Sequence, residues 1–409
     1  MYFSIVYVAL AAAVASTSSP GIHEVAPTFP SNGVSRWVPF ANDGENEGLT
    51  HPMTLQFSVT TPFTDYTKDL TSVMDTGSTG LCISAYDLRL NNTPFMDPQQ
   101  SGSEYLSSSK RFWEGYWIYG TVSFTGSGIV SEVPVLAVTQ NSTCLNFTNG
   151  QCLNKTDVTN WPTGINYMGV GFGRWSQQQP QALPDKVPFI NVKAVDGQSP
   201  AMRQGYIITS HGVYLGLNAT IAEGFEFTKL DLNPNTKDSR DWQMVHVTLT
   251  ANRLTPLGHG PALFDTGIDY SYITLMPQVR ATLHTKNITV ETGGKKSTRT
   301  ILDPDALSIT MLVGHNAPEY PLAYYNVTFD DPAPNPMTPA LNSFVPVAGQ
   351  PHVNTGRMFY NGFDLLYDAQ DGWLGLRWKG GKNDPHGGTF PATGHRVLSY
   401  SGRSQKVVT

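Results

Sequence analysis

The sequence predicts an all-β fold. Only 14% of its 409 residues are charged, and it contains 38 glycines and 29 prolines. Few charges and many turn-forming residues are typical of β-rich globular proteins rather than of helical or disordered chains. From residue 51 onwards, short segments that alternate apolar and polar residues follow one another between turns, as strands with one buried face do. A chain of this length is sufficient for two strand-rich domains.

The N-terminal segment predicts entry into the secretory pathway. Residues 1–15 form an apolar run that ends in Ala-Val-Ala, which is typical of a signal peptide cleaved after Ala15. A buried strand or a membrane anchor is the alternative, but the run is short for a membrane span. Residues 16–50 are rich in Pro, Asn and Gly, so we expect an irregular N-terminal segment there.

Two strand-rich units are expected to follow, an N-terminal one over 51–203 and a C-terminal one over 204–379. Alternating or continuously apolar segments predict strands in both units, over 54–59, 70–75, 117–124, 133–138, 212–218, 242–249 and 261–267. A polar loop is predicted at 140–165. Residues 380–409 are Gly-rich with basic residues, so we expect a disordered basic tail.

Charge and sequons restrict the partners. The formal net charge of −6 argues against a nucleic-acid partner, because phosphate binding needs a basic surface. No second apolar run is long enough for a membrane span, and the tail has no hydrophobic end, so we expect a monomer without a membrane anchor. Seven Asn-x-Ser/Thr sequons predict a glycoprotein in the secretory lumen or outside the cell. They are Asn91, Asn141, Asn146, Asn154, Asn218, Asn287 and Asn326.

The three cysteines predict one disulfide and one buried thiol. Cys144 and Cys152 lie close together in a polar segment, where an oxidising compartment favours a small disulfide. Cys82, which precedes both in the chain, lies in an apolar strand segment and is expected to be a buried, inert thiol rather than a nucleophile.

An Asp-Thr-Gly motif occurs twice, each time directly after an apolar strand segment. Asp75 ends one segment and Asp265 the other, 190 positions later. A carboxylate beside a buried strand is costly unless it is hydrogen-bonded or used. Two carboxyl groups that meet titrate as a pair: one stays protonated and can polarise a carbonyl, while the other takes a proton from water. The repeat therefore predicts two acids that meet within hydrogen-bond distance.

These motifs resemble those of the pepsin-like aspartic proteases over residues 50–380. VMDTGSTGL and ALFDTG are similar to the two catalytic motifs of that family, and residues 356–376 to its closing segment. Residues 167–169 resemble the element that packs behind the first motif. The resemblance implies a bilobal all-β fold, with a substrate cleft between two β-rich lobes and no cofactor or metal.

The resemblance also implies roles for individual residues. It assigns catalysis to Asp75 and Asp265, and a flap over the substrate to Tyr119, Gly120 and Thr121. It also implies that five further residues support the catalytic loops: Thr76, Gly77, Ser78, Thr266 and Gly267. Thr76 and Thr266 are expected to cross-link the two loops, and Ser78 to donate a hydrogen bond to the Asp75 carboxylate.

The sequence departs from the family pattern at several positions. Ile268 stands where the family has a second hydroxyl, so Asp265 needs another donor, such as a backbone N–H, Tyr270 or Ser271. Cys82 replaces a tryptophan and Val122 a flap glycine. Between residues 16 and 52 the chain has a single basic residue, Arg36, where the family has a basic pro-segment.

Other motifs in the sequence do not match known functional signatures or allow two interpretations. No Gly-x-Ser-x-Gly elbow occurs, residues 169–173 lack dinucleotide-binding spacing, and the ten histidines show no metal spacing. Asp269 is expected either in a turn or as an additional acid in the cleft. The aromatic residues between 112 and 119 are expected either to line the cleft or to pack within strands.

Three classes of function remain open. The first is an acid endopeptidase that uses Asp75 and Asp265. The second is a non-proteolytic enzyme of the same fold that binds or cyclises an apolar small molecule, or hydrolyses a glycoside with the carboxyl pair. The third is an inactive binding or inhibitor protein. An open groove would suit a peptide and a closed aromatic chamber a small molecule.

Overall fold

The computed structural model describes most of the chain. The described residues are 26–174, 181–251, 255–292, 295–303, 308–314, 321–328, 337, 344–382, 384 and 386–390. The predicted signal peptide, residues 1–15, and residues 391–409 of the predicted tail lie outside them. Strands dominate, which confirms the all-β prediction. The helices of the described part are α1, Pro277–Arg280, and 3-10 helices at Asp43–Glu45, Glu47–Leu49, Pro98–Gln100, Pro184–Lys186 and Arg357–Asn361.

A nine-stranded sheet contains the first Asp-Thr-Gly motif. Its strands are β2 (Thr54–Thr61), β3 (Thr64–Asp75), β4 (Thr79–Ser84), β5 (Ser101–Leu106), β6 (Arg111–Phe124), β7 (Ile129–Thr148), β8 (Gln151–Asn160), β9 (Asn166–Val170) and β10 (Val192–Val195). The strands run in the order β10-β7-β4-β9-β3-β2-β6-β5, with β8 on β7, and β6 also pairs with β7. That additional pairing closes β7-β4-β9-β3-β2-β6 into a ring. β4 is buried at all six positions, as expected of an apolar strand with both faces covered.

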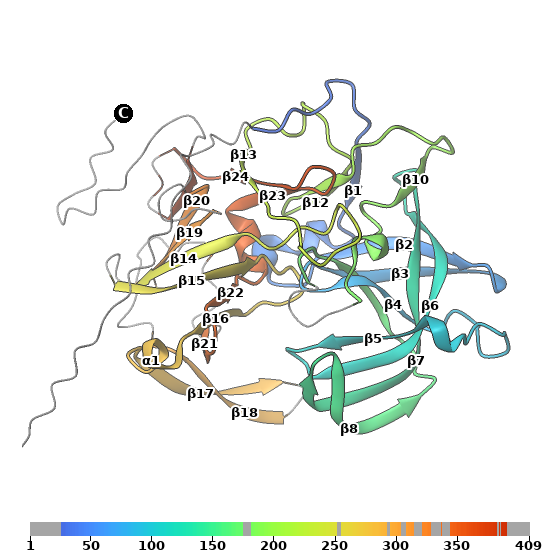
Figure 1. The fold of residues 1–409 in the computed structure, drawn as a ribbon, viewed down its shortest axis with the longest axis horizontal. Helices are drawn as coiled ribbons and strands as arrows, with labels where there is room; N and C mark the ends of the chain where they lie inside the picture. The colour runs from blue at the N-terminus through green and yellow to red at the C-terminus, as the bar shows by residue number, and fades with distance from the viewer. Residues whose placement is uncertain are drawn as a thin grey trace, which may run out of the picture.

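An eight-stranded sheet lies next to the second motif. Its strands are β14 (His246–Ala251), β15 (Thr255–Leu263), β16 (Ser271–Leu275), β19 (Ser308–Val313), β20 (Ala323–Thr328), β21 (Phe344–Ala348), β22 (His352–Asn354) and β25 (Gly387–Thr389). A separate hairpin pairs β17 (Thr285–Thr292) with β18 (Lys295–Leu302). In Figure 1 the blue-to-green strands of the nine-stranded sheet and the yellow-to-red strands of this sheet occupy opposite sides of the molecule.

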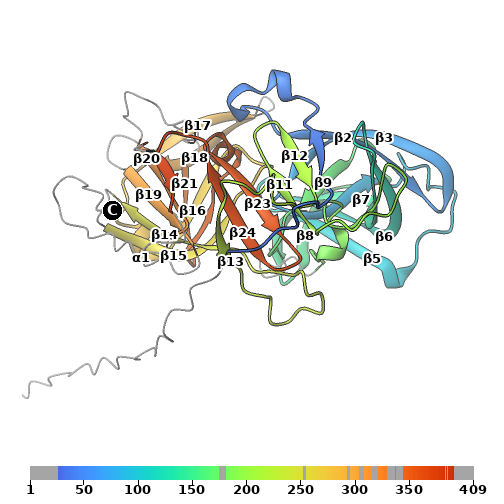
Figure 2. The same cartoon turned by 90° about the horizontal axis from the view of Figure 1, so that it is seen from above.

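A six-stranded sheet joins strands from the two ends of the chain. Its strands are β1 (Arg36–Pro39), β11 (Gly205–Ile208), β12 (Gly212–Leu215), β13 (Glu226–Lys229), β23 (Phe363–Asp368) and β24 (Trp373–Trp378). Figure 2 shows β23 and β24 between the strands of the other two sheets. One hydrophobic cluster includes Met74, Tyr206 and Met311, one residue from each of the three large sheets. The two Asp-Thr-Gly loops are therefore carried by sheets that share a core.

Three predictions about irregular segments were wrong in part. The segment predicted as a polar loop at 140–165 contains the end of β7 and all of β8, because both pair along their length. Within the predicted irregular segment 16–50, β1 pairs with β12, and within the predicted tail β25 pairs with β20. Backbone pairing with a distant strand, invisible in local composition, orders these residues.

The predicted disulfide is confirmed. Cys144 in β7 is bonded to Cys152 in β8, across the turn of their hairpin, and Cys82 is free and buried. No helix of the described residues is long and apolar enough to cross a membrane.

The sequons differ in accessibility. Four of the seven asparagines are exposed: Asn91, Asn146, Asn154 and Asn287. The Asn218 side chain is engaged, because it donates to the carbonyl of Gly33 and accepts from the backbone N–H of Ile221. Asn141 and Asn326 are partly buried.

Candidate active site

The same strand arrangement surrounds both Asp-Thr-Gly motifs. β3, which ends at Asp75, runs parallel to β9, and β4 runs antiparallel to β9 on its other side. β15, which ends at Leu263 just before Asp265, runs parallel to β22, and β16 runs antiparallel to β22. Each loop thus leaves one strand, turns, and returns on the far side of a shared third strand.

The two loops are cross-linked by their threonines. The backbone N–H of Thr76 donates to Oγ1 of Thr266 at 3.0 Å, and the N–H of Thr266 donates to Oγ1 of Thr76 at 2.9 Å. Each hydroxyl in turn donates across the interface, Thr76 to the carbonyl of Phe264 and Thr266 to that of Met74. These buried bonds join residues 188 to 192 positions apart and fix the two loops relative to each other.

The glycines of both motifs bring the acids together. The N–H of Gly77 donates to Oδ1 of Asp75 at 2.7 Å, and that of Gly267 to Oδ1 of Asp265 at 2.8 Å. A Cβ on Gly77 would lie 2.6 Å from Oδ2 of Asp265, and one on Gly267 would collide with the Asp75 carboxylate. Only glycine therefore permits each carboxylate to lie against the opposite loop.

The two carboxyl groups meet, as the repeat predicted, since each lies against the glycine of the opposite loop. Both side chains are buried, Asp75 with 3% and Asp265 with 5% of its surface exposed. Burial, then the negative charge of Asp75, then the bond to Asp75 raise the pKa of Asp265 well above its usual value. Asp265 therefore holds a proton more tightly than an ordinary carboxyl group, as one member of a closely spaced acid pair does.

The second oxygen of each carboxyl group accepts a hydrogen bond from a side chain to which the sequence analysis gave no such role. The hydroxyl of Tyr167 donates to Oδ2 of Asp75 at 2.7 Å, and Nδ2 of Asn354 donates to Oδ2 of Asp265 at 2.6 Å. Tyr167 lies in β9 opposite Val73, and Asn354 lies in β22 opposite Leu263. Each donor is thus paired with the residue two positions before its own aspartate.

Ser78 and Ile268 do not contribute donors to the acids. The Ser78 hydroxyl is buried without a hydrogen-bond partner among the described residues, so its predicted bond to Asp75 is wrong. Of the donors considered for Asp265, the Gly267 N–H does bind it, whereas Ser271 donates to the carbonyl of Thr355. A sequence signal did exist: Tyr167 and Asn354 each stand two residues before a glycine.

The predicted flap residues lie elsewhere. Tyr119, Gly120 and Thr121 are inside β6, where all three pair with β7, and the Tyr119 side chain is 70% exposed. They belong to one arm of the β6–β7 hairpin, whose turn follows Phe124, whereas the contacts with the catalytic loops come from another hairpin. The hairpin that reaches the catalytic loops is β5–β6, whose turn spans residues 107–110.

A cavity of about 450 Å³ adjoins the acids. It is bounded by the β5–β6 hairpin, by the segment before β9, and by Gly267 and Ile268 of the second loop. Tyr167 also lines it, so the cavity touches groups that donate hydrogen bonds to both aspartates. Its volume lies in the range of small-ligand sites.

The aromatic residues between 112 and 119 divide between the two expected roles. Trp113 lines the cavity and lies edge-on to Tyr167, with ring centroids 5.6 Å apart. Tyr116 packs against Phe95 within the strands. Asp269 is half exposed and lies 3.6 Å from the Arg357 guanidinium, away from any bond to the pair.

Three ionisable side chains are buried near the acid pair. Burial lowers the pKa of the Arg174 guanidinium, and the charges of Asp265, Asp75 and Glu104 oppose that shift. Burial, followed by the charge of Asp75, raises the pKa of Glu104 to about 8. Burial and then the charge of Arg174 lower the pKa of His352 to about 4. Around neutral pH, Glu104 and His352 are therefore largely uncharged.

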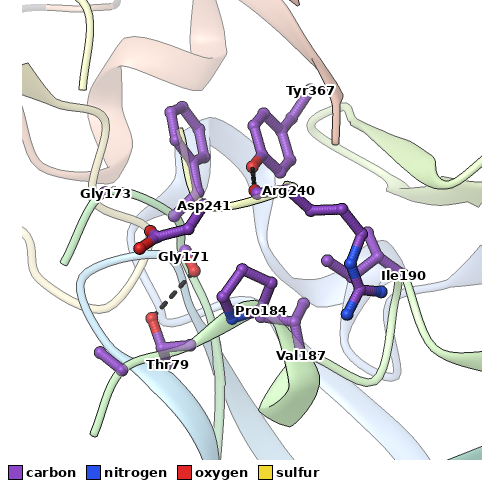
Figure 3. Close-up of a pocket in the computed structure, with 11 residues that line it drawn as sticks. Thr79, Gly171, Gly173, Pro184, Val187, Ile190, Arg240, Asp241 and Tyr367 are labelled. Carbon is purple, nitrogen blue, oxygen red and sulfur yellow. Dashed lines mark hydrogen bonds between the residues drawn. The ribbon is translucent and has the colours of Figure 1, made fainter. Parts of the chain in front are cut away.

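A second cavity lies behind the first catalytic loop and is too small for a substrate. It measures about 10 Å³, room for at most about one water. Figure 3 shows Thr79 and Tyr367 at its walls, each with its hydroxyl bonded to a backbone carbonyl, that of Gly171 and that of Arg240. The two hydrogen bonds stabilise the backbone around this cavity, which is too small to bind a substrate.

Among the described residues, no group of three or more His, Cys, Asp or Glu side chains could hold a metal ion. No protein-family model matches the chain, and a comparison with curated proteins found no match. The chemistry of the site is therefore inferred from its own geometry.

Proposed function

We propose that the chain is an aspartic-type endopeptidase with a bilobal, pepsin-like arrangement, acting in the secretory pathway or outside the cell. The observation that carries the proposal is the buried pair of Asp75 and Asp265, in which each carboxyl group accepts one hydrogen bond from the glycine of its own loop and one from a side chain of a neighbouring strand. The duplicated strand arrangement supports two equivalent lobes, and the disulfide is compatible with an oxidising compartment.

The geometry supports water activation between the two acids. The Asp75 carboxylate takes a proton from a water molecule while the water oxygen bonds to the peptide carbonyl carbon. At the same time Asp265 gives its proton to the carbonyl oxygen, so a diol forms. Asp75 then passes its proton to the amide nitrogen while Asp265 recovers one from the diol. The C–N bond breaks, and an amine and a carboxylic acid leave. Both aspartates end in their initial protonation states.

Tyr167 and Asn354 would hold the two carboxyl groups in place during these transfers. Burial, then the charge of Asp75, raise the pKa of Tyr167 well above its usual value, so its hydroxyl stays protonated and can only donate to Asp75. The Asn354 amide is oriented by the N–H of Gly356, which donates to its Oδ1 at 3.0 Å. Its NH₂ group is thereby directed at Asp265.

A second candidate is an enzyme or binder for an apolar small molecule, which the bounded cavity of about 450 Å³ favours. The geometry gives no support to glycoside hydrolysis. In glycoside hydrolases the two catalytic carboxyl groups stand about 5 Å or more apart. Asp75 and Asp265 lie closer, since a hydrogen bond between them contributes to the raised pKa of Asp265. An inactive protein would have no use for two rigidly held acids.

The test is cleavage of a mixed peptide library by purified protein from pH 3 to pH 7. We expect cleavage by the wild type, and a loss of at least about 10³-fold in Asp75→Asn and in Asp265→Asn, since each removes one of the two proton transfers. Activity should fall at high pH as Asp265 loses the proton that it donates. If folded wild type cuts no peptide over this range, the peptidase proposal fails and the small-molecule candidate takes its place.

A further inference from the structure

Three arginines lie near the catalytic loops, and none of them forms a salt bridge within the described part of the chain. Arg111, the first residue of β6, lines the cavity. Arg174 is 9% exposed, and its Nε is buried without a hydrogen-bond partner. Arg299 of β18 stacks on the Tyr270 ring at 3.8 Å, and its Nη1 is likewise buried and unpartnered within the described chain.

The acids that face these arginines are mostly neutral or already paired. The pKa of Asp265 is raised well above its usual value, and Glu104, with a pKa of about 8, is uncharged up to neutral pH. Asp269 lies 3.6 Å from Arg357, and Glu114, next to the cavity wall, is held by Lys155. Arg174 has Asp265, Asp75 and Glu104 as its electrostatic neighbours, and of these Asp265 and Glu104 hold their protons more tightly than ordinary carboxyl groups.

The cavity wall is cationic, although the whole chain carries a formal charge of −6. A buried guanidinium without an ion pair or full hydrogen bonding is costly, and its planar array of N–H donors matches a carboxylate. Arg174 and Arg299 contain such buried donors, and Arg111 presents the same donors to the cavity from an exposed position, so the three together favour an anionic ligand. Arg111 is the one formally charged side chain of the cavity wall, which contains no Asp or Glu.

We propose that the cleft selects peptides with an acidic side chain beside the scissile bond, a specificity that rests on the proposed peptidase function. The acidic side chain enters the cavity of about 450 Å³, where its carboxylate meets Arg111. The buried indole Nε1 of Trp113, which has no partner among the described residues, offers a second donor in the same wall. Arg299 attracts further negative charge on the side of the second loop.

This specificity has a distinct dependence on pH. A glutamate side chain of a peptide ionises near pH 4.3, whereas the arginines remain charged throughout. His352 adds no charge above its pKa of about 4. Preference for Glu over Gln should therefore appear above about pH 4.5 and fade below it, whatever the pH profile of the chemical step.

The experiment uses three peptides that differ only in having Glu, Gln or Lys beside the cleaved bond. At pH 5.5 we expect kcat/KM to be about 10-fold higher for Glu than for Gln, and lowest for Lys. Arg111→Gln should bring the Glu:Gln ratio close to one, Arg111→Glu should favour Lys, and Arg299→Gln should reduce the ratio by less. Lys193→Gln, an equal change of charge on an exposed residue of β10, is the control and should leave the ratio unchanged.

The outcomes separate this inference from the function on which it rests. Cleavage with equal kcat/KM for Glu and Gln, or a Glu preference that survives both arginine substitutions, overturns the inference and leaves the peptidase standing. If no peptide is cut, calorimetric binding of the same three peptides to the wild type decides. Tighter binding of the Glu peptide, abolished by Arg111→Gln, supports the cationic cleft without proteolysis, and equal or absent binding overturns it.

Discussion

The two halves of the catalytic centre reach the same geometry with different chemistry. In the first half a phenol, Tyr167, holds Asp75, and the hydroxyl of Ser78 remains nearby without a partner. In the second half an amide, Asn354, holds Asp265, and Ile268 leaves no hydroxyl in reserve. Equivalent positions in β9 and β22 carry both donors. The comparison teaches that the strand arrangement preserves the place of a donor while its chemical identity changes.

The difference also predicts unequal tolerance to mutation. A donor lost in the first half has a substitute hydroxyl in the same loop, whereas one lost in the second half has none. A hydrogen bond to a charged or shared-proton group is worth about 1.5–3 kcal/mol, which corresponds to about 10- to 150-fold in rate. The predictions below are made for the proposed peptidase and run from the largest expected effect to the smallest.

The largest effect is expected from Asn354→Leu. It removes the donor to Oδ2 of Asp265 and leaves the Gly356 N–H without its acceptor. We expect kcat to fall by about 100-fold with a smaller change in KM, because the misplaced acid affects proton transfer more than binding. Steady-state kinetics across pH measures both quantities.

A second-site change sharpens this prediction. Ile268→Thr, added to Asn354→Leu, supplies a hydroxyl in the loop of Asp265 and should recover about 10-fold of the lost kcat. Ile268→Val is the matched control, since it keeps the β-branched shape without a hydroxyl. Equal recovery by Val and Thr would mean that packing, and not hydrogen bonding, separates the two halves.

Tyr167→Phe should have a smaller effect. It removes the 2.7 Å bond to Asp75 but keeps the ring against Trp113. We expect about a 10-fold fall in kcat, because the Ser78 hydroxyl can partly replace the phenol. In this background Ser78→Ala should reduce kcat further, whereas Ser78→Ala alone should change it by less than about 2-fold. A large effect of Ser78→Ala alone would contradict the assignment of Tyr167.

Glu104 lies in β5, in the first half of the site, and is a buried acid in addition to the catalytic pair. Its folded pKa of about 8 lies above the unfolded value of 4.5, so the native state binds the proton more tightly. The resulting stability is fully present below about pH 4.5 and is lost as the pH rises to about 8, a change of a few kcal/mol.

Glu104→Gln should flatten this dependence, because the amide resembles the protonated acid and does not titrate. Thermal unfolding between pH 4.5 and pH 8 measures it: the wild type should lose more Tm than the variant over this interval. Parallel curves would show that Glu104 does not titrate in this range in the folded protein.

The sequence by itself determined the chemistry that is encoded locally. Each Asp-Thr-Gly triplet contains its acid, its cross-linking hydroxyl and the glycine that admits the opposite carboxylate, so the repeat was sufficient to predict that Asp75 and Asp265 meet. The Cys144–Cys152 bridge was predictable for the same reason, since eight positions separate its ends. The all-β class followed from composition and short alternating segments.

The tertiary structure alone decided which side chains complete the site. Tyr167 and Asn354 lie 92 and 89 positions from the acids that they hold, and a parallel strand register selects them. A shift of one residue would direct these side chains to the opposite face of the strand. The hairpin beside the acids depends on the same cause, because it is identified by which turn reaches Gly267 and Ile268, not by its composition. Pairing between distant strands thus determines the two donors and brings Arg111 into the cavity wall, since hydrogen bonds and burial depend on spatial neighbours rather than on local sequence.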